Sequence, residues 1–231
     1  MVTQIGDKTN PIRQNNLMEA VIDELLETRF NKIEHVSSTG STNSDLVARA
    51  LTLPDGFLLV SDYQTDGRGR KGRKWDAPPG RNLIFSVLLR PKWSPERHQL
   101  VTPALALATV EVLEKFGLRT SVKWPNDVMI GVDNYKKVAG ILAEYVQQEN
   151  PVLIVGMGLN VSWPQQKDSA PPNSTSLIAC GVGKDRSELL VEILKNFEER
   201  LIEISSEKGN TTFRQAHIAK SSTIGEQVKV E

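Results

Sequence analysis

Apolar and polar residues follow strand and helix spacings along the chain, in an order that predicts an α/β domain. Apolar runs typical of strands lie at residues 32–37, 57–61, 82–90, 119–124, 127–131, 137–146 and 151–160. Short connections join the last four runs, and such close spacing favours antiparallel neighbours. We therefore predict an α/β (α+β) fold with a mixed, mostly antiparallel sheet and flanking helices.

Apolar residues at helical spacing predict a set of helices between these strands. The helices are expected at residues 16–30, 44–51, 95–116 and 210–219, and after Asp185. The helix at 95–116 begins with Ser94 and Pro95, and its many Ala and Leu residues predict burial on more than one face. The helix after Asp185 has an apolar stripe formed by Leu189, Leu190, Ile193, Leu194, Phe197, Leu201 and Ile204. Residues 163–176 are rich in Pro, Ser and Gln and predict a flexible loop.

The composition limits the classes of protein to which the chain can belong. Lys+Arg and Asp+Glu both number 28, whereas a dedicated nucleic-acid coat protein would have a basic excess. Cys180 is the single cysteine, so an internal disulfide is impossible, which fits a reducing compartment. The cysteine and histidines lack zinc-site spacing, and no apolar run reaches membrane-spanning length. We predict a cytoplasmic protein that makes no contact with a membrane.

The stretch from Gln64 to Trp75, which we call the basic loop, lies between two apolar runs. Five of the seven residues at 68–74 are cationic, and the other two are glycines. Glycines allow a close approach of backbone to a ligand, and arginine forks suit phosphate and carboxylate groups. The pattern predicts a mobile lid over an anionic ligand. A solvated basic face, or a patch for nucleic acid, is the alternative interpretation.

Three other stretches offer chemistry, each with a plainer alternative. In Val122-Lys-Trp-Pro-Asn-Asp127, the carboxylate of the last residue could bind Mg²⁺ or accept a proton. The plainer alternative is that the stretch is an ordinary turn. Strand alternation places Lys137 on a face of small and apolar residues, opposite the face of Gly140. There the lysine could bind a carboxylate or phosphate, and the plainer alternative is a lysine at the end of a strand that extends its charge into solvent. The glycines of Val155-Gly-Met-Gly-Leu-Asn160 leave room for a flat group, and Asn160 offers an amide to an adenine edge. The plainer alternative is that the glycines allow a helix to pack closely against the sheet.

Taken in order, these motifs closely resemble those of biotin–protein ligase, also called biotin–[acetyl-CoA-carboxylase] ligase. The matching stretches are Ser41-Thr-Asn43, Gly67-Arg-Gly-Arg-Lys-Gly-Arg-Lys-Trp75, Lys123-Trp-Pro-Asn-Asp127, Lys137-Val-Ala-Gly-Ile-Leu142 and Gly156-x-Gly-x-Asn160. The resemblance implies a catalytic domain like that of class II aminoacyl-tRNA synthetases, which makes biotinyl-5′-AMP from biotin and ATP with Mg²⁺. The acyl group then passes to one lysine of the biotin carboxyl carrier protein of acetyl-CoA carboxylase. The resemblance is also compatible with a homodimer.

The resemblance also implies roles for particular residues. The set that binds biotin and ATP comprises Ser41, Thr42, Asn43, Gln64, Gly67, Arg68, Arg70, Trp75, Lys123, Asn126, Lys137, Gly140, Gly158 and Asn160. Within it, Ser41, Thr42 and Gln64 would hydrogen-bond the ureido ring, and Lys137 would contact the biotin carboxylate and the α-phosphate. The catalytic set comprises Arg68, Arg70, Asp127 and Lys137, and the metal ligand is Asp127.

The resemblance divides the chain into an N-terminal tail with a short helix at 1–30 and a catalytic domain at 31–220. Residues 221–231 would start a C-terminal SH3-like barrel. The single short helix at the N-terminus predicts ligase activity without specific DNA binding.

Other functions remain open at this point. Lipoate–protein ligase and octanoyl transferase have a similar fold and attach a different acyl group to a different carrier, although the basic-loop motif favours biotin. A thiol acyl transferase would need Cys180, which has no histidine near it in the sequence. A nucleic-acid-binding protein would use residues 68–74, but aromatic residues make up only 6% of the chain.

Overall fold

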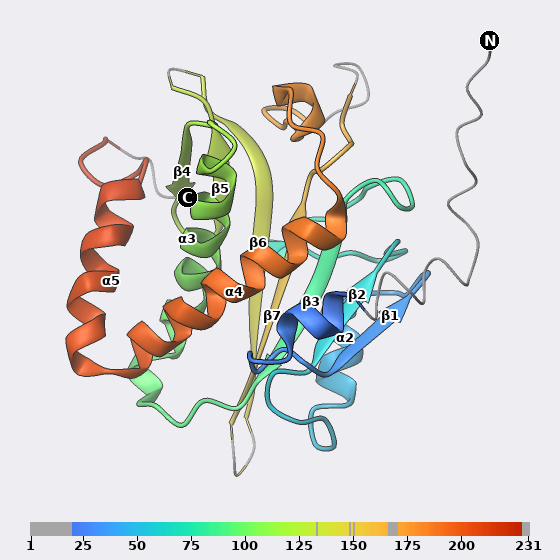
Figure 1. Ribbon diagram of the computed structural model, residues 1–231, viewed down its shortest axis with the longest axis vertical. Coiled ribbons are helices and arrows are strands. Elements are labelled where there is room, and N and C mark those ends of the chain that lie inside the picture. The colour runs from blue at the N-terminus through green and yellow to red at the C-terminus, as the bar shows by residue number, and fades with distance from the viewer. Residues whose placement is uncertain (1–19, 133, 148, 150, 166–170, 228–231) are drawn as a thin grey trace.

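The computed structural model describes residues 20–132, 134–147, 149, 151–165 and 171–227. These residues form a seven-stranded sheet with helices packed around it (Figure 1). Its strands are β1 (Ile33–Val36), β2 (Leu58–Ser61), β3 (Leu83–Leu89), β4 (Thr120–Lys123), β5 (Asp127–Ile130), β6 (Lys136–Val146) and β7 (Val152–Leu159). Their order across the sheet is β1-β2-β3-β7-β6-β5-β4. β1 and β2 are parallel, and all other neighbours are antiparallel. The predicted mixed, mostly antiparallel sheet is confirmed.

Helices cover both faces of this sheet. The helices are α2 (Thr42–Ala48), α3 (Val101–Glu114), α4 (Arg186–Ser205) and α5 (Glu207–Lys220). In β3, Phe85 and Val87 belong to the large core that includes α3 and α4, whereas Leu88 belongs to a small core with Leu46 of α2. Because strand side chains alternate between faces, α2 covers the face opposite α3 and α4. In Figure 1, α4 crosses the sheet and α5 lies beside it at the edge.

Capping side chains fix the starts of α2 and α4. The Ser41 hydroxyl accepts a hydrogen bond from the Ser44 backbone N–H at 3.5 Å. The negative charge of Asp45 in the first turn interacts favourably with the helix dipole. The Asp185 carboxylate accepts from the Ser187 N–H at 2.8 Å, as predicted for the helix that follows it. All seven residues of the predicted apolar stripe on α4 are buried.

The predicted helix at 95–116 is shorter and begins later than expected. Pro95–Leu100 form a 3₁₀ helix, η2, and the α-helix starts only at Val101. The Ser94 side chain contacts Glu96 and makes no cap hydrogen bond to the backbone, so the α-helical start predicted there is wrong. The prediction of burial on several faces is confirmed, because ten residues of α3 are buried.

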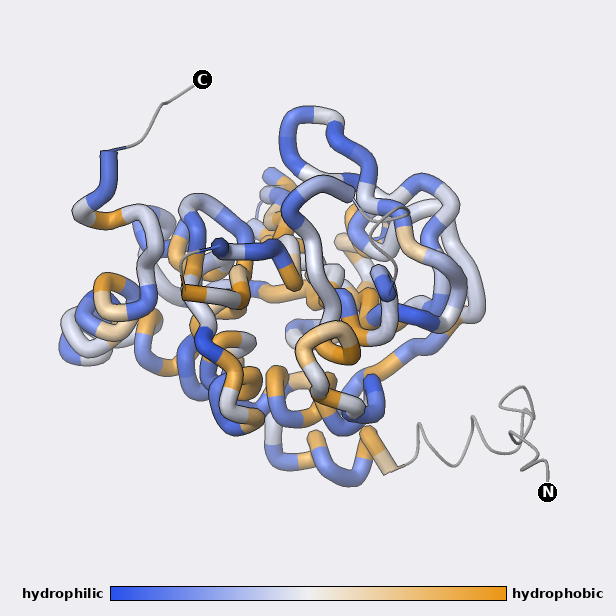
Figure 2. Tube along the Cα trace, turned by 90° about the horizontal axis from the view of Figure 1, so that it is seen from above, coloured by the Kyte–Doolittle hydropathy of each residue, from blue (hydrophilic) through white to orange (hydrophobic). Residues whose placement is uncertain are grey.

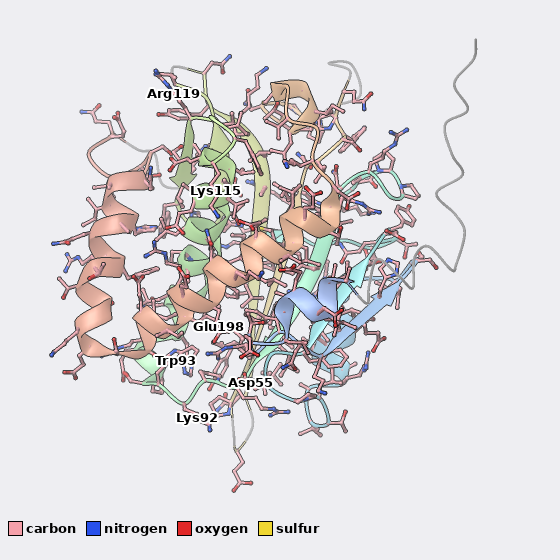
Figure 3. The ribbon with its side chains drawn as sticks, viewed as in Figure 1. Asp55, Lys92, Trp93, Lys115, Arg119 and Glu198 are labelled. Atoms are coloured by element: carbon pink, nitrogen blue, oxygen red, sulfur yellow. The ribbon has the colours of Figure 1, made fainter. Side chains whose placement is uncertain are left out.

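Ion pairs join the outer elements to the body. Lys115, after α3, pairs with Glu192 of α4 at 2.7 Å. Arg29 pairs with Glu198 of α4 at 2.8 Å and with Asp55 at 3.5 Å, and Figure 3 shows these two acids near one another. In Figure 2, hydrophobic positions recur along the helices and strands, while the outer loops are mostly hydrophilic. Among the described residues, no helix has the length and apolar character that crossing a membrane requires.

Two predicted segments reach beyond the described residues, and one loop differs from expectation. The helix predicted at 16–30 is helical at 20–25 and then turns, and its first four residues lie outside the described part. The strand predicted from Gly225 is not formed at 225–227, where the chain makes a turn and a bend, and the rest of it lies outside the described part. The described residues of the loop predicted at 163–176 lie outside helices and strands as expected, but Ser176 is fully buried and donates to the Pro164 carbonyl at 2.8 Å, so that end is held in place.

Candidate functional site

A cavity of about 140 Å³ lies between the start of α2, the middle of the sheet and the basic loop. The residues predicted from the sequence that line it are Ser41, Thr42, Asn43, Gln64, Arg68, Arg70, Trp75, Asn126, Asp127, Lys137, Gly140 and Gly158. They come from α2, the basic loop, β5, β6 and β7, so only the folded sheet brings them together.

Buried polar side chains form the floor of this cavity. Gln64 Oε1 accepts from the Thr42 backbone N–H at 2.8 Å and from its hydroxyl at 3.0 Å. The hydroxyls of Thr42 and Ser86 lie 2.6 Å apart, and the Ser86 hydroxyl donates to Asn43 Oδ1 at 2.6 Å. Since Gln64 Oε1 is held by α2, its amide NH₂ is oriented away from Thr42 and can donate elsewhere. The floor is neutral and offers both donors and acceptors to a ligand.

The floor continues to the rim of the cavity through a carboxylate. Asn43 Nδ2 donates to the Leu142 carbonyl at 3.2 Å and to Glu144 Oε2 at 2.8 Å. The same carboxylate pairs with Arg68 of the basic loop at 3.0 Å. A continuous set of polar contacts therefore joins the start of α2 to the basic loop.

Two glycines of β7 let flat side chains rest on the sheet. A Cβ atom on Gly156 would lie 2.1 Å from Asn43 Oδ1, and one on Gly158 would lie 2.3 Å from Trp75 Cε2. The alternating glycines were predicted to leave room for a flat group. In this structure the flat groups are the amide of Asn43 and the indole of Trp75.

Lys137 provides the positive charge at the other end of the cavity. Its Nζ lies 2.7 Å from Asp127 Oδ1 and 5.5 Å from the centroid of the Trp75 ring. A Cβ on Gly140 would lie 3.0 Å from the same Nζ, so Lys137 and Gly140 share a face. The Asn126 side chain, beside Asp127, donates to the Ile141 carbonyl at 2.8 Å, which fixes the corner between β4 and β5 against β6.

Strand alternation predicted that Lys137 and Gly140 point to opposite faces, and this prediction is wrong. The pairing of β5 with β6 shifts between Val128 and Met129, so Val138 is an extra residue in β6. Such a bulge reverses the facing of the residues that precede it. The Lys137 side chain is thereby aimed at the cavity.

The basic loop folds back on itself above the cavity. The Trp75 backbone N–H donates to the Gly67 carbonyl at 2.8 Å, and that of Gly69 donates to the Arg73 carbonyl at 2.7 Å. Gly72 has φ = 71°, which favours glycine at the turn. A Cβ on Gly67 would lie 2.3 Å from the Trp75 carbonyl oxygen, so a glycine is needed where the two ends of the loop meet.

The structure places three predicted residues outside the lining of this cavity. Gly67 supports the base of the basic loop, and Lys123 is exposed at the end of β4, opposite Asp127. The Asn160 side chain is buried, where its Nδ2 donates to the Thr175 carbonyl and its Oδ1 accepts from Asn82, both at 2.9 Å. These bonds favour a structural role for Asn160 over contact with an adenine.

Among the residues of the site that were absent from the predicted set, three stand out. Ser86 is the only polar residue of β3, a strand that is buried throughout, and that contrast was a usable signal. Gly156 stands in the same motif as Gly158. Glu144 follows Gly140 and Leu142 on one strand face, where a carboxylate was also a usable signal.

A second cavity, of about 600 Å³, adjoins the first and shares four lining residues with it, among them Arg70 and Asn126. Its lining includes Trp124, which is 63% exposed, and two residues of α5, Arg214 and His217. Burial lowers the pKa of His217, so the imidazole is neutral near pH 7. The described lining of this cavity contains no acidic side chain, which suits an anionic group or an incoming polar chain.

Within the described part of the chain, no three His, Cys, Asp or Glu side chains gather as a metal cluster. Asp127 is the acidic residue among those that line the first cavity. The Nε1 of Trp75 is buried against Gly158 and finds no hydrogen-bond acceptor among the described residues.

Comparisons with known proteins agree on one family. The profile of the biotin/lipoate A/B protein ligase family matches residues 33–162. The biotin–[acetyl-CoA-carboxylase] ligase of Mycobacterium tuberculosis is 34% identical over 229 residues, which are 96% of this chain and 82% of that ligase. The bifunctional ligase/repressor BirA of Bacillus spizizenii is 38% identical over 71% of this chain, which spans about half (51%) of the length of BirA.

The fold agrees with a solved structure of the same family. The biotin protein ligase from Aquifex aeolicus, in complex with biotin and ATP, matches with a TM-score of 0.72 at 33% identity. The match covers 85% of this chain and 81% of that one.

Proposed function

This chain belongs to the biotin/lipoate A/B protein ligase family, and we propose that it activates biotin with ATP and transfers it to a carrier protein. The resemblance seen in the sequence motifs is thereby confirmed at the level of the family. The observation that carries the function is the arrangement of the first cavity. A neutral floor of hydroxyl and amide groups suits the ureido ring of biotin, and a cationic end suits its carboxylate beside a phosphate.

In the first step, a carboxylate oxygen of biotin attacks the α-phosphorus of ATP. A P–O bond to the β-phosphate breaks, which leaves biotinyl-5′-AMP and releases pyrophosphate. An anion must approach a polyanion in this step, so nearby positive charge lowers the barrier. Lys137, Arg68 and Arg70 supply that charge, because all three line the cavity.

The donors present fit a Mg²⁺ ion that arrives with the nucleotide. Mg²⁺ is commonly bound by one or two carboxylates together with substrate phosphates and water. Asp127 supplies such a carboxylate, and the described residues offer no larger cluster that would form an all-protein cage. The ion would neutralise charge on the phosphates.

In the second step, a carrier lysine attacks the acyl carbon of biotinyl-5′-AMP, and the C–O bond to AMP breaks. The lysine has a solution pKa of about 10.4 and must lose a proton first. We assign that proton to Asp127, the acidic residue among those that line the cavity. The acceptor is a biotin carboxyl carrier protein, and the adjoining acid-free cavity, which shares Arg70, gives its lysine a route.

The basic loop must move during this cycle. A cavity of about 140 Å³ is smaller than the roughly 300–1,000 Å³ of most small-molecule sites. The loop must therefore withdraw to admit biotin and ATP and then close to exclude water from the hydrolysable adenylate.

The replacement Arg70→Ala tests the role of the loop in retention. Arg70 lines both cavities, so its loss leaves the adenylate less covered. We expect biotinyl-5′-AMP to dissociate about 10- to 100-fold faster, in line with the loss of roughly 1.5–3 kcal/mol from a charge-assisted hydrogen bond. Release of radiolabelled adenylate into a chase of unlabelled biotin measures the rate. Release at the wild-type rate would remove Arg70 from the lid.

The function itself is tested by mass spectrometry under non-denaturing conditions after incubation with biotin, ATP and Mg²⁺. We expect a complex heavier than the protein by one biotinyl-5′-AMP. We also expect ATP–pyrophosphate exchange that depends on biotin. Exchange that depends on lipoate or octanoate would instead assign the chain to another branch of the family.

A further inference from the structure

Glu144, near the end of β6, joins two parts of the site that are far apart in the sequence. Its Oε2 accepts from Asn43 Nδ2 at 2.8 Å and from Arg68 Nη2 at 3.0 Å. Its Oε1 lies 3.1 Å from the same arginine nitrogen. One carboxylate therefore connects the fixed floor of the cavity to the basic loop.

Glu144 is held in place by more than its ion pair with Arg68. Its side chain is 27% exposed, and that of Arg68 is 42% exposed, so solvent screens the pair only in part. Glu144 is also held from the other side, because the Asn43 amide that donates to it is buried against Gly156. A carboxylate fixed in this way offers Arg68 a preformed partner, which lowers the entropic cost of ordering the loop.

We propose that Glu144 is a positioning residue for the ligase reaction, which restrains the basic loop over the cavity through Arg68. The consequence for catalysis rests on the proposed function, whereas the restraint itself is a property of the ligand-free chain. Without the Glu144 charge, the loop opens more often, and the adenylate beneath it escapes sooner. Asn43 keeps the Leu142 carbonyl as a second acceptor, so the floor survives the change.

Limited trypsin digestion measures the restraint without any ligand. Trypsin cleaves after Lys and Arg, and the basic loop holds five such residues at 68–74. When opening is fast relative to cleavage, the cutting rate follows the population of the open loop. We expect the nearly isosteric Glu144→Gln to be cut in the loop about fivefold faster than wild type, with fragment masses identifying the sites. Dissociation of bound biotinyl-5′-AMP should accelerate by a similar factor.

The ion pair between Glu34 and Arg49 provides a matched control. Glu34 accepts from two guanidinium nitrogens at 3.1 and 2.8 Å, and both side chains are 38% exposed. Neither residue lines the cavity. Glu34→Gln should therefore leave both loop cutting and adenylate release at wild-type rates, although it removes a comparable charge pair.

A double variant separates restraint through Arg68 from a general loss of order. Arg68→Ala should itself accelerate cutting at the sites after Arg70, and adding Glu144→Gln should accelerate it no further. A full additional effect in the double variant, or wild-type cutting in Glu144→Gln, would overturn the proposal. If cutting changes as expected but wild type retains no biotinyl-5′-AMP, the restraint stands and the proposed function fails.

Discussion

Replacing Lys137 with alanine is expected to reduce biotin-dependent ATP–pyrophosphate exchange by about 10²- to 10³-fold, the usual effect of removing one preorganised electrostatic group. The bulge at Val138 turns the Lys137 side chain into the cavity, where its Nζ lies 2.7 Å from Asp127. Among the described residues, two lysines line the cavity, Lys74 and Lys137. Lys74 belongs to the basic loop, so Lys137 is the one that lies on the sheet. Initial rates with radiolabelled pyrophosphate measure the effect.

Lys136→Ala is the matched control for this prediction. Lys136 is the preceding residue of the same strand, pairs with Ile130, and is not among the residues that line the cavity. We expect exchange close to the wild-type rate. Lys137 and Asp127 are 33% and 26% exposed, so their pair contributes about 1 kcal/mol or less to folding. An unchanged thermal transition in Lys137→Ala would exclude unfolding as the cause of lost exchange, whereas equal exchange in both variants would show that Lys137 is not an electrostatic group of the reaction.

The extent to which the fold could be predicted depends on how local each signal is. The apolar stripe of α4 and the apolar run of β3 are patterns within one element, and both became buried as expected. The 3₁₀ helix at Pro95–Leu100 could not be told from an α-helix, because both begin with the same cap and proline signals. In the structure, the Ser94 side chain contacts Glu96 and does not cap the backbone, and spacing along the sequence does not encode that side-chain choice.

The candidate site was only partly predictable for a related reason. Glycine spacing in β7 indicated that flat groups lie on the sheet, but their identity depends on contacts over long stretches of chain. Asn43 lies against Gly156, and Trp75 lies against Gly158. The orientation of Lys137 depends on a bulge whose position is set by pairing with β5, which no pattern within β6 reveals. The motifs therefore identified the residues of the site, whereas sheet register decided how they meet.

Replacing Gly158 with alanine is expected to remove the Trp75 indole from its place on the sheet. The added Cβ would lie 2.3 Å from Cε2 and 2.5 Å from Nε1 of the indole, which is closer than real side chains approach. Gly158 lies within β7 and has no positive φ, so alanine suits the backbone and the clash with the ring is the main effect. Losing the burial of a large side chain costs roughly 1.5–3 kcal/mol. Adenylate retention should therefore fall about 10- to 100-fold.

The control for this prediction is Gly183→Ala, because a Cβ on Gly183 meets nothing within 4 Å and its φ is not positive. Retention of biotinyl-5′-AMP and loop cutting by trypsin, measured on both variants, separate the clash from the loss of a glycine. Gly158→Ala should lose adenylate faster and be cut faster in the basic loop, while Gly183→Ala should match wild type. Normal retention in Gly158→Ala would mean that the place of the indole on the sheet does not affect how long the adenylate is held. The closed loop would then rest on its arginines alone.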